Sequence, residues 1–174
     1  MHDETRTPGP GIRPKLPQPL TTLDWLMEIG ALAGITVTAL ILAVAWPSLP
    51  RTVPMHFGPS GRVDAWGDRS ITLALPILVA FIYGVTTLLG RFPHVFNYPW
   101  PITPENAAAQ YRAAGVLLRG LKLEMAWLFA YIQWRMIRIA LGDTNGLGAW
   151  FLPAALALVL ATLGWGIVRM YRAR

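Results

Sequence analysis

The stretch that decides the fold is residues 46–70, which read WPSLPRTVPMHFGPSGRVDAWGDRS. It contains four prolines, three glycines, two tryptophans, one histidine and two acids, and a long apolar run lies on each side of it. Turn-forming residues at this density predict a loop. Apolar runs of about 20 residues have the length needed to cross a hydrocarbon core ~30 Å thick. The sequence therefore predicts a loop held between two membrane spans, and this loop is where specific chemistry is expected.

The composition of the whole chain points to the same class of protein. Of its 174 residues, 54% are hydrophobic and only 14% are charged, against roughly 25% charged in an average soluble domain. Cysteine is absent from the sequence, which excludes disulfides, thiolate metal ligands and cysteine nucleophiles. The net charge of +6 is carried almost entirely by arginine. In a membrane protein such a surplus reports topology and lipid contact, and no basic and aromatic stripe predicts nucleic-acid binding.

The remaining segments predict an all-α integral membrane protein of one domain. Residues 1–22 form a polar, proline-rich tail, which should be extended or disordered unless a partner holds it. Residues 23–174 form the transmembrane domain, with predicted spans at about 25–46, 71–90, 113–141 and 150–168. The predicted architecture is a four-helix transmembrane bundle with a structured extracytoplasmic loop between the first and second helices.

The third predicted helix, from about residue 104 to residue 141, is unusually polar for a span. Its central residues 125–134 form an uncharged stretch of only ten positions, about half a crossing. Charged side chains at intramembrane depth mark functional sites by default, and the candidates here are Arg119, Lys122, Glu124 and Arg135. A helix that is polar on two sides must be covered by other helices, line a wet cavity, or project its first half into the head-group layer.

Glu124 has two interpretations. As an intramembrane acid it is a candidate for a proton relay. Alternatively, it forms a structural ion pair with an arginine of the same bundle, or contacts lipid head groups. On a helical wheel Arg119 and Lys122 share one face, whereas Glu124 and Arg135 lie on roughly the opposite one.

Small residues mark a packing face on the first predicted helix. Gly30 and Gly34 form a GxxxG pair, and Thr38 follows one turn later. Such a stripe lets two helix backbones approach closely. It would pack either on another helix of this chain or on a partner protein.

Arginine and lysine counts predict the orientation. If four helices cross, ten of the fifteen basic residues lie on the side that holds both termini and five on the side of the 46–70 loop. Cytoplasmic segments carry the excess of basic residues. We therefore expect a multi-pass protein of the bacterial cytoplasmic (inner) membrane, with both termini in the cytoplasm and the loop facing outward.

Potential ligands gather in the loop, at His56, Asp64 and Asp68. Residues 53–57 and 62–66 flank a Gly-Pro-Ser-Gly turn at 58–61, which predicts a small hairpin with His56 across from Asp64. This pair would either bind a proton or a divalent metal, or hold the shape of the loop. Three ligands on one loop are too few for a closed zinc site, so we predict no metal site and no cofactor. Phe57 and Trp66 would be interfacial anchors or ligand contacts.

The loop also resembles a known family. Residues 49–67, followed by an apolar helix that contains Leu75-Pro76, are similar to the bacterial membrane domain-of-unknown-function family 1648, found also at the front of SdpI-type immunity proteins. The resemblance covers about residues 25–90. The residues that carry its signature are His56, Phe57, Gly61, Asp64, Trp66 and Gly67. Gly58 departs from the family pattern, in which asparagine is common at this position.

The resemblance implies a multi-pass membrane module. In SdpI-type proteins the implied role is protection against a secreted toxin peptide, together with sequestering a transcriptional repressor at the membrane. The second half of this chain does not follow the SdpI pattern, so nothing is carried over to it.

These observations predict a protein that is not an enzyme. The sequence has no nucleophile and base set, no P-loop and no dinucleotide fingerprint. The first functional prediction is a recognition or immunity/signalling module whose outward loop meets an extracytoplasmic peptide or envelope partner. The alternative is a structural accessory subunit bound to other membrane proteins in a larger complex. A small transporter or metal-dependent envelope enzyme is the least favoured. In each case the lipid bilayer is a partner.

Overall fold

The computed structural model describes residues 13–174, and the predicted tail therefore lies partly outside the described residues. Four α-helices and one two-stranded hairpin account for most of the chain. The elements are α1 (Thr22–Ala45), β1 (Thr52–Phe57), β2 (Val63–Asp68), α2 (Ala74–Leu89), α3 (Ala107–Ala140) and α4 (Phe151–Arg172). Short 3-10 helices at Trp46–Ser48, Arg69–Leu73 and Pro93–Val95 join them.

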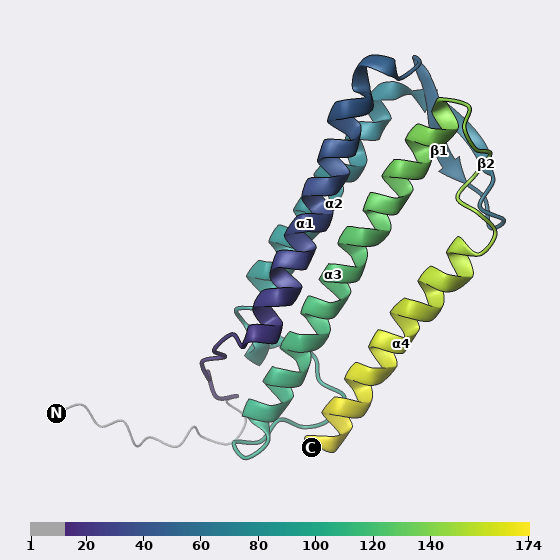
Figure 1. The fold of residues 1–174 in the computed structure, drawn as a ribbon. Helices are drawn as coiled ribbons and strands as arrows, with labels where there is room; N and C mark the ends of the chain where they lie inside the picture. The colour runs from purple at the N-terminus through teal and green to yellow at the C-terminus, as the bar shows by residue number, and fades with distance from the viewer. Residues whose placement is uncertain (1–12) are drawn as a thin grey trace.

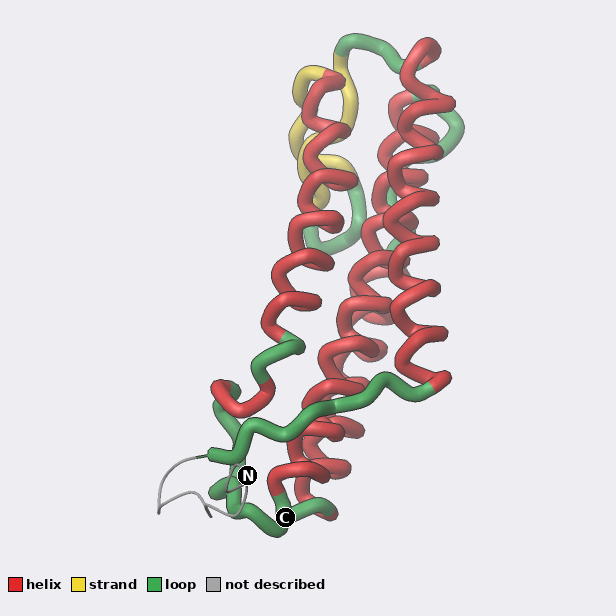
Figure 2. The backbone as a smooth tube through the Cα atoms, turned by 90° about the vertical axis from the view of Figure 1, so that its left-hand side faces the viewer, coloured by secondary structure: helices red, strands yellow, loops and turns green. Residues whose placement is uncertain are grey.

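The four helices lie along one long axis, with the hairpin at one end (Figures 1 and 2). The C-terminus of the chain and the start of α1 are both at the opposite end. Helix α3 is central, because it packs against α1, α2 and α4, and its most extensive interface is with α1. Helix α4 packs mainly on α3.

Three segments are long and apolar enough to cross a membrane: Thr22–Ser48, Arg69–Leu89 and Phe151–Arg172. Their outer surfaces are rich in exposed leucine, isoleucine, valine and phenylalanine side chains, as lipid-facing helices require. Helix α3 has 34 residues, about 50 Å at 1.5 Å per residue, but its charged residues exclude it from this set. The fourth predicted span, within α3, therefore stays a prediction.

The small-residue stripe of α1 packs on α3 of the same chain. A β-carbon added at Gly34 would lie 2.9 Å from the Ala126 β-carbon and 3.1 Å from its carbonyl carbon. The Trp127 indole donates a hydrogen bond to the Gly30 carbonyl at 3.1 Å. Further along α1, the fully buried Thr38 donates its hydroxyl hydrogen to the Gly34 carbonyl at 2.8 Å. The glycines thus permit the backbone approach on which the α1–α3 interface depends.

Residues 52–68 form the predicted hairpin, with an irregular register. Phe57 pairs with Val63 and Pro54 pairs with Trp66, but His56 faces Ala65 and not Asp64. The register shifts on both sides of His56. A shift of this kind bends the ribbon and re-aims side chains, which explains why the simple hairpin register that we predicted was one residue off.

The hairpin is attached to the bundle on two sides. Val53 is fully buried in a cluster with Leu42, Leu49 and Ile137, at the ends of α1 and α3. The turn of the hairpin contacts the loop between α3 and α4, where the Leu147 amide donates to the Gly61 carbonyl at 2.8 Å. Gly61 has a φ of +73°, a conformation that favours glycine. The loop predicted from residues 46–70 is therefore an ordered part of the fold.

The α1–α3 contact makes a testable prediction at Gly34. Substitution Gly34→Leu should force the two backbones apart and lower the free energy of unfolding by about 1–3 kcal/mol, a typical cost of overpacking. The matched control is Gly84→Leu on α2, because a β-carbon at Gly84 meets no atom within 4 Å. Denaturant unfolding in detergent micelles would measure both variants. Equal stability of the two would contradict the close α1–α3 packing.

Candidate functional site

Five charged side chains form a cluster between α1 and α3 near the end that holds the start of α1. The two acids come from α1 and the three bases from α3; they are Asp24, Glu28, Arg112, Arg119 and Lys122. Asp24 is fully buried and Lys122 is 4% exposed. Charges are rarely buried unless they are paired. The polar face of α3 can be buried because its bases pair with the acids of α1.

Asp24 is held at the first turn of α1. Its carboxylate accepts hydrogen bonds from the Thr21 amide at 2.7 Å and from the Thr21 hydroxyl at 2.8 Å, and the Thr21 hydroxyl in turn caps the helix. Arg112 donates to the same carboxylate, and Arg119 lies 3.3 Å from its other oxygen. The capping box therefore also positions an acid for two arginines of α3.

Glu28 lies one turn deeper and joins three helices. Its two carboxylate oxygens accept from the Lys122 ammonium at 2.6 and 2.7 Å, and Arg119 is 3.6 Å away. From α2, the Tyr83 hydroxyl donates to Glu28 at 2.8 Å. Lys122 also donates to the Thr87 hydroxyl at 2.9 Å and lies 4.4 Å from the centre of the Tyr83 ring, within range of a cation–π contact.

The other two predicted intramembrane residues are in separate places. Glu124 faces α4, where the Thr162 hydroxyl donates to it. Arg135 is near the hairpin end and donates to the Gly146 carbonyl at 2.8 Å and to the Thr144 hydroxyl at 2.6 Å. The structure thus divides the four candidates among three environments: Arg119 and Lys122 in the ion cluster, Glu124 beside α4, and Arg135 under the α3–α4 loop.

Sequence reasoning missed Asp24 and Glu28 as partners of the α3 bases. Two acids near the start of a helix are accounted for by the helix dipole alone, so no partner on another helix was predicted for them. A signal was present, since two acids four residues apart on α1 match bases three and seven residues apart on α3. That spacing indicates one acidic face on α1 and one basic face on α3. It does not predict that the two helices are neighbours.

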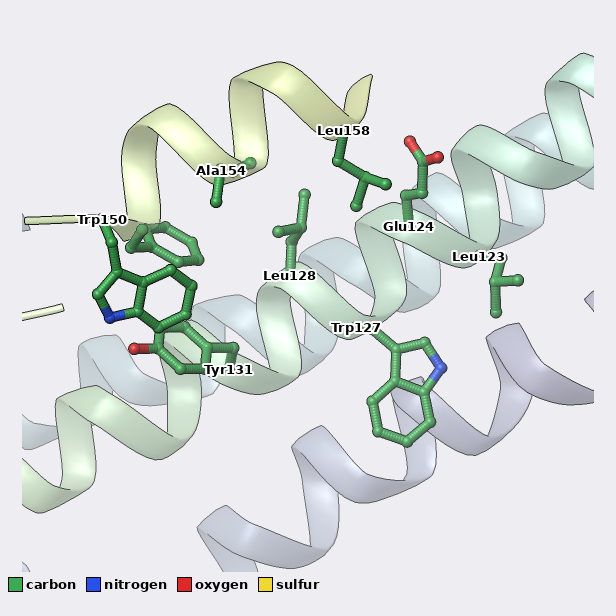
Figure 3. Close-up of a pocket in the computed structure, with 10 residues that line it drawn as sticks. Leu123, Glu124, Trp127, Leu128, Tyr131, Trp150, Ala154 and Leu158 are labelled. Carbon is green, nitrogen blue, oxygen red and sulfur yellow. The ribbon is translucent and has the colours of Figure 1, made fainter. Parts of the chain in front are cut away.

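Glu124 lies at one end of an apolar groove between α3 and α4. Figure 3 shows its carboxylate beside Leu158, with Tyr131 and Trp150 at the other end of the groove. The groove has a volume of about 410 Å³. Oxygen Oε2 of Glu124 is buried and has no hydrogen-bond partner within residues 13–174.

The hairpin brings the predicted His56 and Asp64 together. Their side chains meet at 2.6 Å between Nδ1 and Oδ1, and 68% and 50% of their respective side-chain surfaces are exposed. Trp66 is 52% exposed on the same strand as Asp64. Phe57 is partly buried, and Gly67 leaves room for the Met55 side chain, whose sulfur would lie 3.0 Å from an added β-carbon.

Asp68 does not join His56 and Asp64. Its carboxylate caps the following 3-10 helix by accepting from the Ser70 amide at 2.9 Å, and this hydrogen bond lowers the pKa of Asp68. No group of three His, Asp or Glu residues that could hold a metal ion occurs in the described part of the chain. The weak metal candidates from the sequence therefore do not form a ligand set.

The three long apolar helices define this chain as a membrane protein by length and composition. Residues 33–80 match the family model described as a domain of unknown function, DUF1648. The resemblance predicted for the first half of the chain is thereby confirmed over the second half of α1, the hairpin and the start of α2.

One relative is an uncharacterized protein from Archaeoglobus fulgidus, which is 37% identical over 91 residues. The match covers 48% of this chain and 50% of that protein, so the chain spans about half the length of the relative. No solved structure matches the chain.

The ion cluster predicts a large cost for breaking the Lys122–Glu28 pair. In Lys122→Met, Glu28 loses its closest cation while remaining partly buried, and the free energy of unfolding should fall by about 3 kcal/mol or more. The double variant Glu28→Leu with Lys122→Met should recover part of that loss, because neither charge is then left unpaired. Unfolding in micelles at several denaturant concentrations would measure both.

The matched control is Arg138→Met. Arg138 pairs with Asp143 at 2.9 Å, but the two side chains are 48% and 44% exposed, so the loss should stay below about 1 kcal/mol. Equally small losses in Lys122→Met and Arg138→Met would show that the cluster does not hold the helices together.

Proposed function

We propose that this protein is a non-enzymatic recognition module of the cell membrane, which binds an extracytoplasmic peptide or protein through the exposed face of its hairpin. The observation that carries the proposal is the His56–Asp64 pair, which is exposed next to Trp66 on an ordered ribbon. The proposal includes four spans, both termini in the cytoplasm, and the hairpin outside.

The exposed hairpin face has the composition of a binding surface. Met55 and Trp66 are about half exposed, and tryptophan is enriched among the residues that dominate binding energy. The adjacent His56–Asp64 pair offers one acid and one hydrogen-bonding ring. The opposite side of the ribbon is held by Val53 in the bundle core. A rigid ribbon of this kind loses little conformational freedom when a partner binds.

The arrangement of the helices supports four spans. The polar face of α3 is covered by the acids of α1 and by Tyr83 and Thr87 of α2, so these charges are paired away from lipid. With α3 as the fourth span, ten of the fifteen basic residues belong to the segments before α1, between α2 and α3 or in the first half of α3, and after the apolar part of α4. This distribution favours a cytoplasmic location for that side.

A binding role also fits the surroundings of His56 and Asp64 better than a catalytic role. The groove between α3 and α4 and the hollow between the hairpin turn and the α3–α4 loop are both lined by other residues. Substrate sites are concave and largely enclosed, whereas 68% and 50% of the side-chain surfaces of His56 and Asp64 are exposed.

The alternative, an accessory subunit of a larger complex, was suggested by the glycine stripe, the polar third helix and the proline-rich tail. The first two of these features have partners inside the chain. The Gly30 and Gly34 stripe packs on α3, and the bases of α3 pair with Asp24 and Glu28. These features no longer require a partner protein. We therefore favour recognition at the hairpin and treat the accessory role as an outcome of the test.

The proposal predicts a specific photo-crosslink at position 66. A benzoylphenylalanine placed at Trp66 should yield a discrete adduct with a peptide or protein in intact cells, and His56→Ala or Asp64→Ala in the same chain should weaken that adduct at least fivefold. The matched control is the same photo-crosslinker at Trp165, which is 47% exposed on α4 and should yield lipid adducts only.

Two results would overturn the proposal. Position 66 could yield no protein or peptide adduct, or its adduct could be insensitive to His56→Ala and Asp64→Ala. If position 165 yields adducts with a stoichiometric membrane partner that also co-purifies in mild detergent, the accessory-subunit alternative is supported instead.

A further inference from the structure

The groove between α3 and α4 has the size of a small-molecule site. The two helices are in close contact toward the end of the chain, where a β-carbon at Gly166 would lie 2.7 Å from the Leu117 side chain. Toward the hairpin they separate and leave the groove of about 410 Å³, within the ~300–1,000 Å³ range of ligand pockets. Figure 3 shows Leu128, Ala154 and Leu158 along its walls.

Among residues 13–174, Glu124 supplies the one carboxylate that lines this groove, and no lysine, arginine or histidine lines it. Its Oε1 accepts from the Thr162 hydroxyl, and its Oε2 is buried without a hydrogen-bond partner in that part of the chain. The bases nearest in sequence do not neutralise it, because Arg119 and Lys122 are engaged with Asp24 and Glu28 across the helix. A buried oxygen without a partner is costly, and it points to a donor that comes from outside the chain.

The depth of Glu124 limits what that donor can be. Its partner Thr162 lies seven residues before Arg169, the first basic residue of the final turns of α4. Seven residues of helix correspond to about 10 Å, so the carboxylate lies well inside the apolar length of α4. A lipid head group at the membrane surface is therefore out of reach. A donor that can arrive there must be carried by a largely apolar molecule.

The far end of the groove is aromatic. Tyr131 stacks on Phe151 with ring centres 4.8 Å apart, and Trp150 lies 5.5 Å from Tyr131 in an edge-on arrangement. From Glu124 to Tyr131 the helix rises about 10 Å. A molecule in the groove thus meets an acid at one end and an apolar aromatic wall at the other. The distance between the two ends is about the length of a chain of eight carbons.

We propose that this groove binds a membrane-permeant amphiphilic amine, which enters from the lipid phase. Its ammonium group donates to Oε2 of Glu124, and its apolar body lies against Leu128, Leu158 and Tyr131. A cation with N–H donors satisfies both the charge and the open hydrogen-bonding position of the carboxylate. The site is distinct from the hairpin surface and does not rest on the function proposed for it.

The first test measures binding of radiolabelled octylamine to the full chain in phosphatidylcholine nanodiscs, by equilibrium dialysis near neutral pH, with empty nanodiscs as the blank. We expect saturable binding of one octylamine per chain. Binding should be at least tenfold weaker in Glu124→Gln. It should be unchanged in the control Glu105→Gln, because Glu105 is exposed in the connection between α2 and α3. Octanol, which has the same chain but no charge, should not displace octylamine. Equal binding to wild type and Glu124→Gln, or displacement by octanol at equal concentration, would overturn the proposal, since a plain lipid chain would then be the occupant.

A second measurement uses only the wild-type protein, so it does not depend on the folding of a variant. Dicyclohexylcarbodiimide, an apolar reagent, modifies carboxyl groups that are reachable from lipid through their protonated fraction, and pairing with an ammonium ion removes that fraction. Mass spectrometry of peptides should find the modification at Glu124 but not at the ion-paired Asp24 or Glu28. Octylamine can itself displace the urea from an activated carboxyl group, so the carbodiimide adduct and the octylamide are counted together. Octylamine should slow the total modification of Glu124 at least fivefold, and octanol should not. Absence of modification at Glu124, or no protection by octylamine, would overturn the proposal.

Discussion

The fold depends on the pairing of charges between α1 and α3. Asp24 and Glu28 on one helix meet Arg112, Arg119 and Lys122 on the other, and Tyr83 and Thr87 bring α2 into the same network. Each of these groups would be costly to place in lipid alone. Because the partners are on different helices, the charges stabilise the bundle only when α1, α2 and α3 assemble in this register. The close glycine contact further along α1 then extends the same interface toward the hairpin.

This pairing explains how α3 can be both central and polar. Arg112, Arg119 and Lys122 face α1 and α2. Ala126 and Ala130 are buried, and Glu124, the one acid of α3, turns toward α4. Helix α4 itself is apolar and contacts the bundle mainly through α3. Oxygen Oε2 of Glu124, which is buried without a hydrogen-bond partner in the described residues, lies at the groove between α3 and α4.

Much of the architecture could be predicted from the sequence, but the pairing of helices could not. The density of turn residues in 46–70 predicted a structured loop, and the segments on either side of the Gly-Pro-Ser-Gly turn predicted a hairpin. The positions of His56 and Asp64 on it predicted that they would meet, as they do at 2.6 Å. Periodicity on α3 correctly separated Lys122 from Glu124. Periodicity describes the faces of a single helix, however, and which face meets which neighbour depends on the packing of the whole bundle. For this reason Asp24 and Glu28 were not recognised as partners, and the shifted register around His56 was not foreseen.

The two proposed sites are connected by a short series of hydrogen bonds at the hairpin end of the bundle. The Tyr131 hydroxyl, at the end of the α3–α4 groove, donates to the Leu147 carbonyl at 2.7 Å. The Leu147 amide donates to the Gly61 carbonyl in the hairpin turn at 2.8 Å. Residues that test one site must therefore lie away from this connection. His56, Asp64 and Trp66 are on the strands, beyond the turn, and Glu124 is at the opposite end of the groove. Substitutions at these positions remove no atom of the Tyr131–Leu147–Gly61 hydrogen bonds, so we expect each substitution to report on its own site.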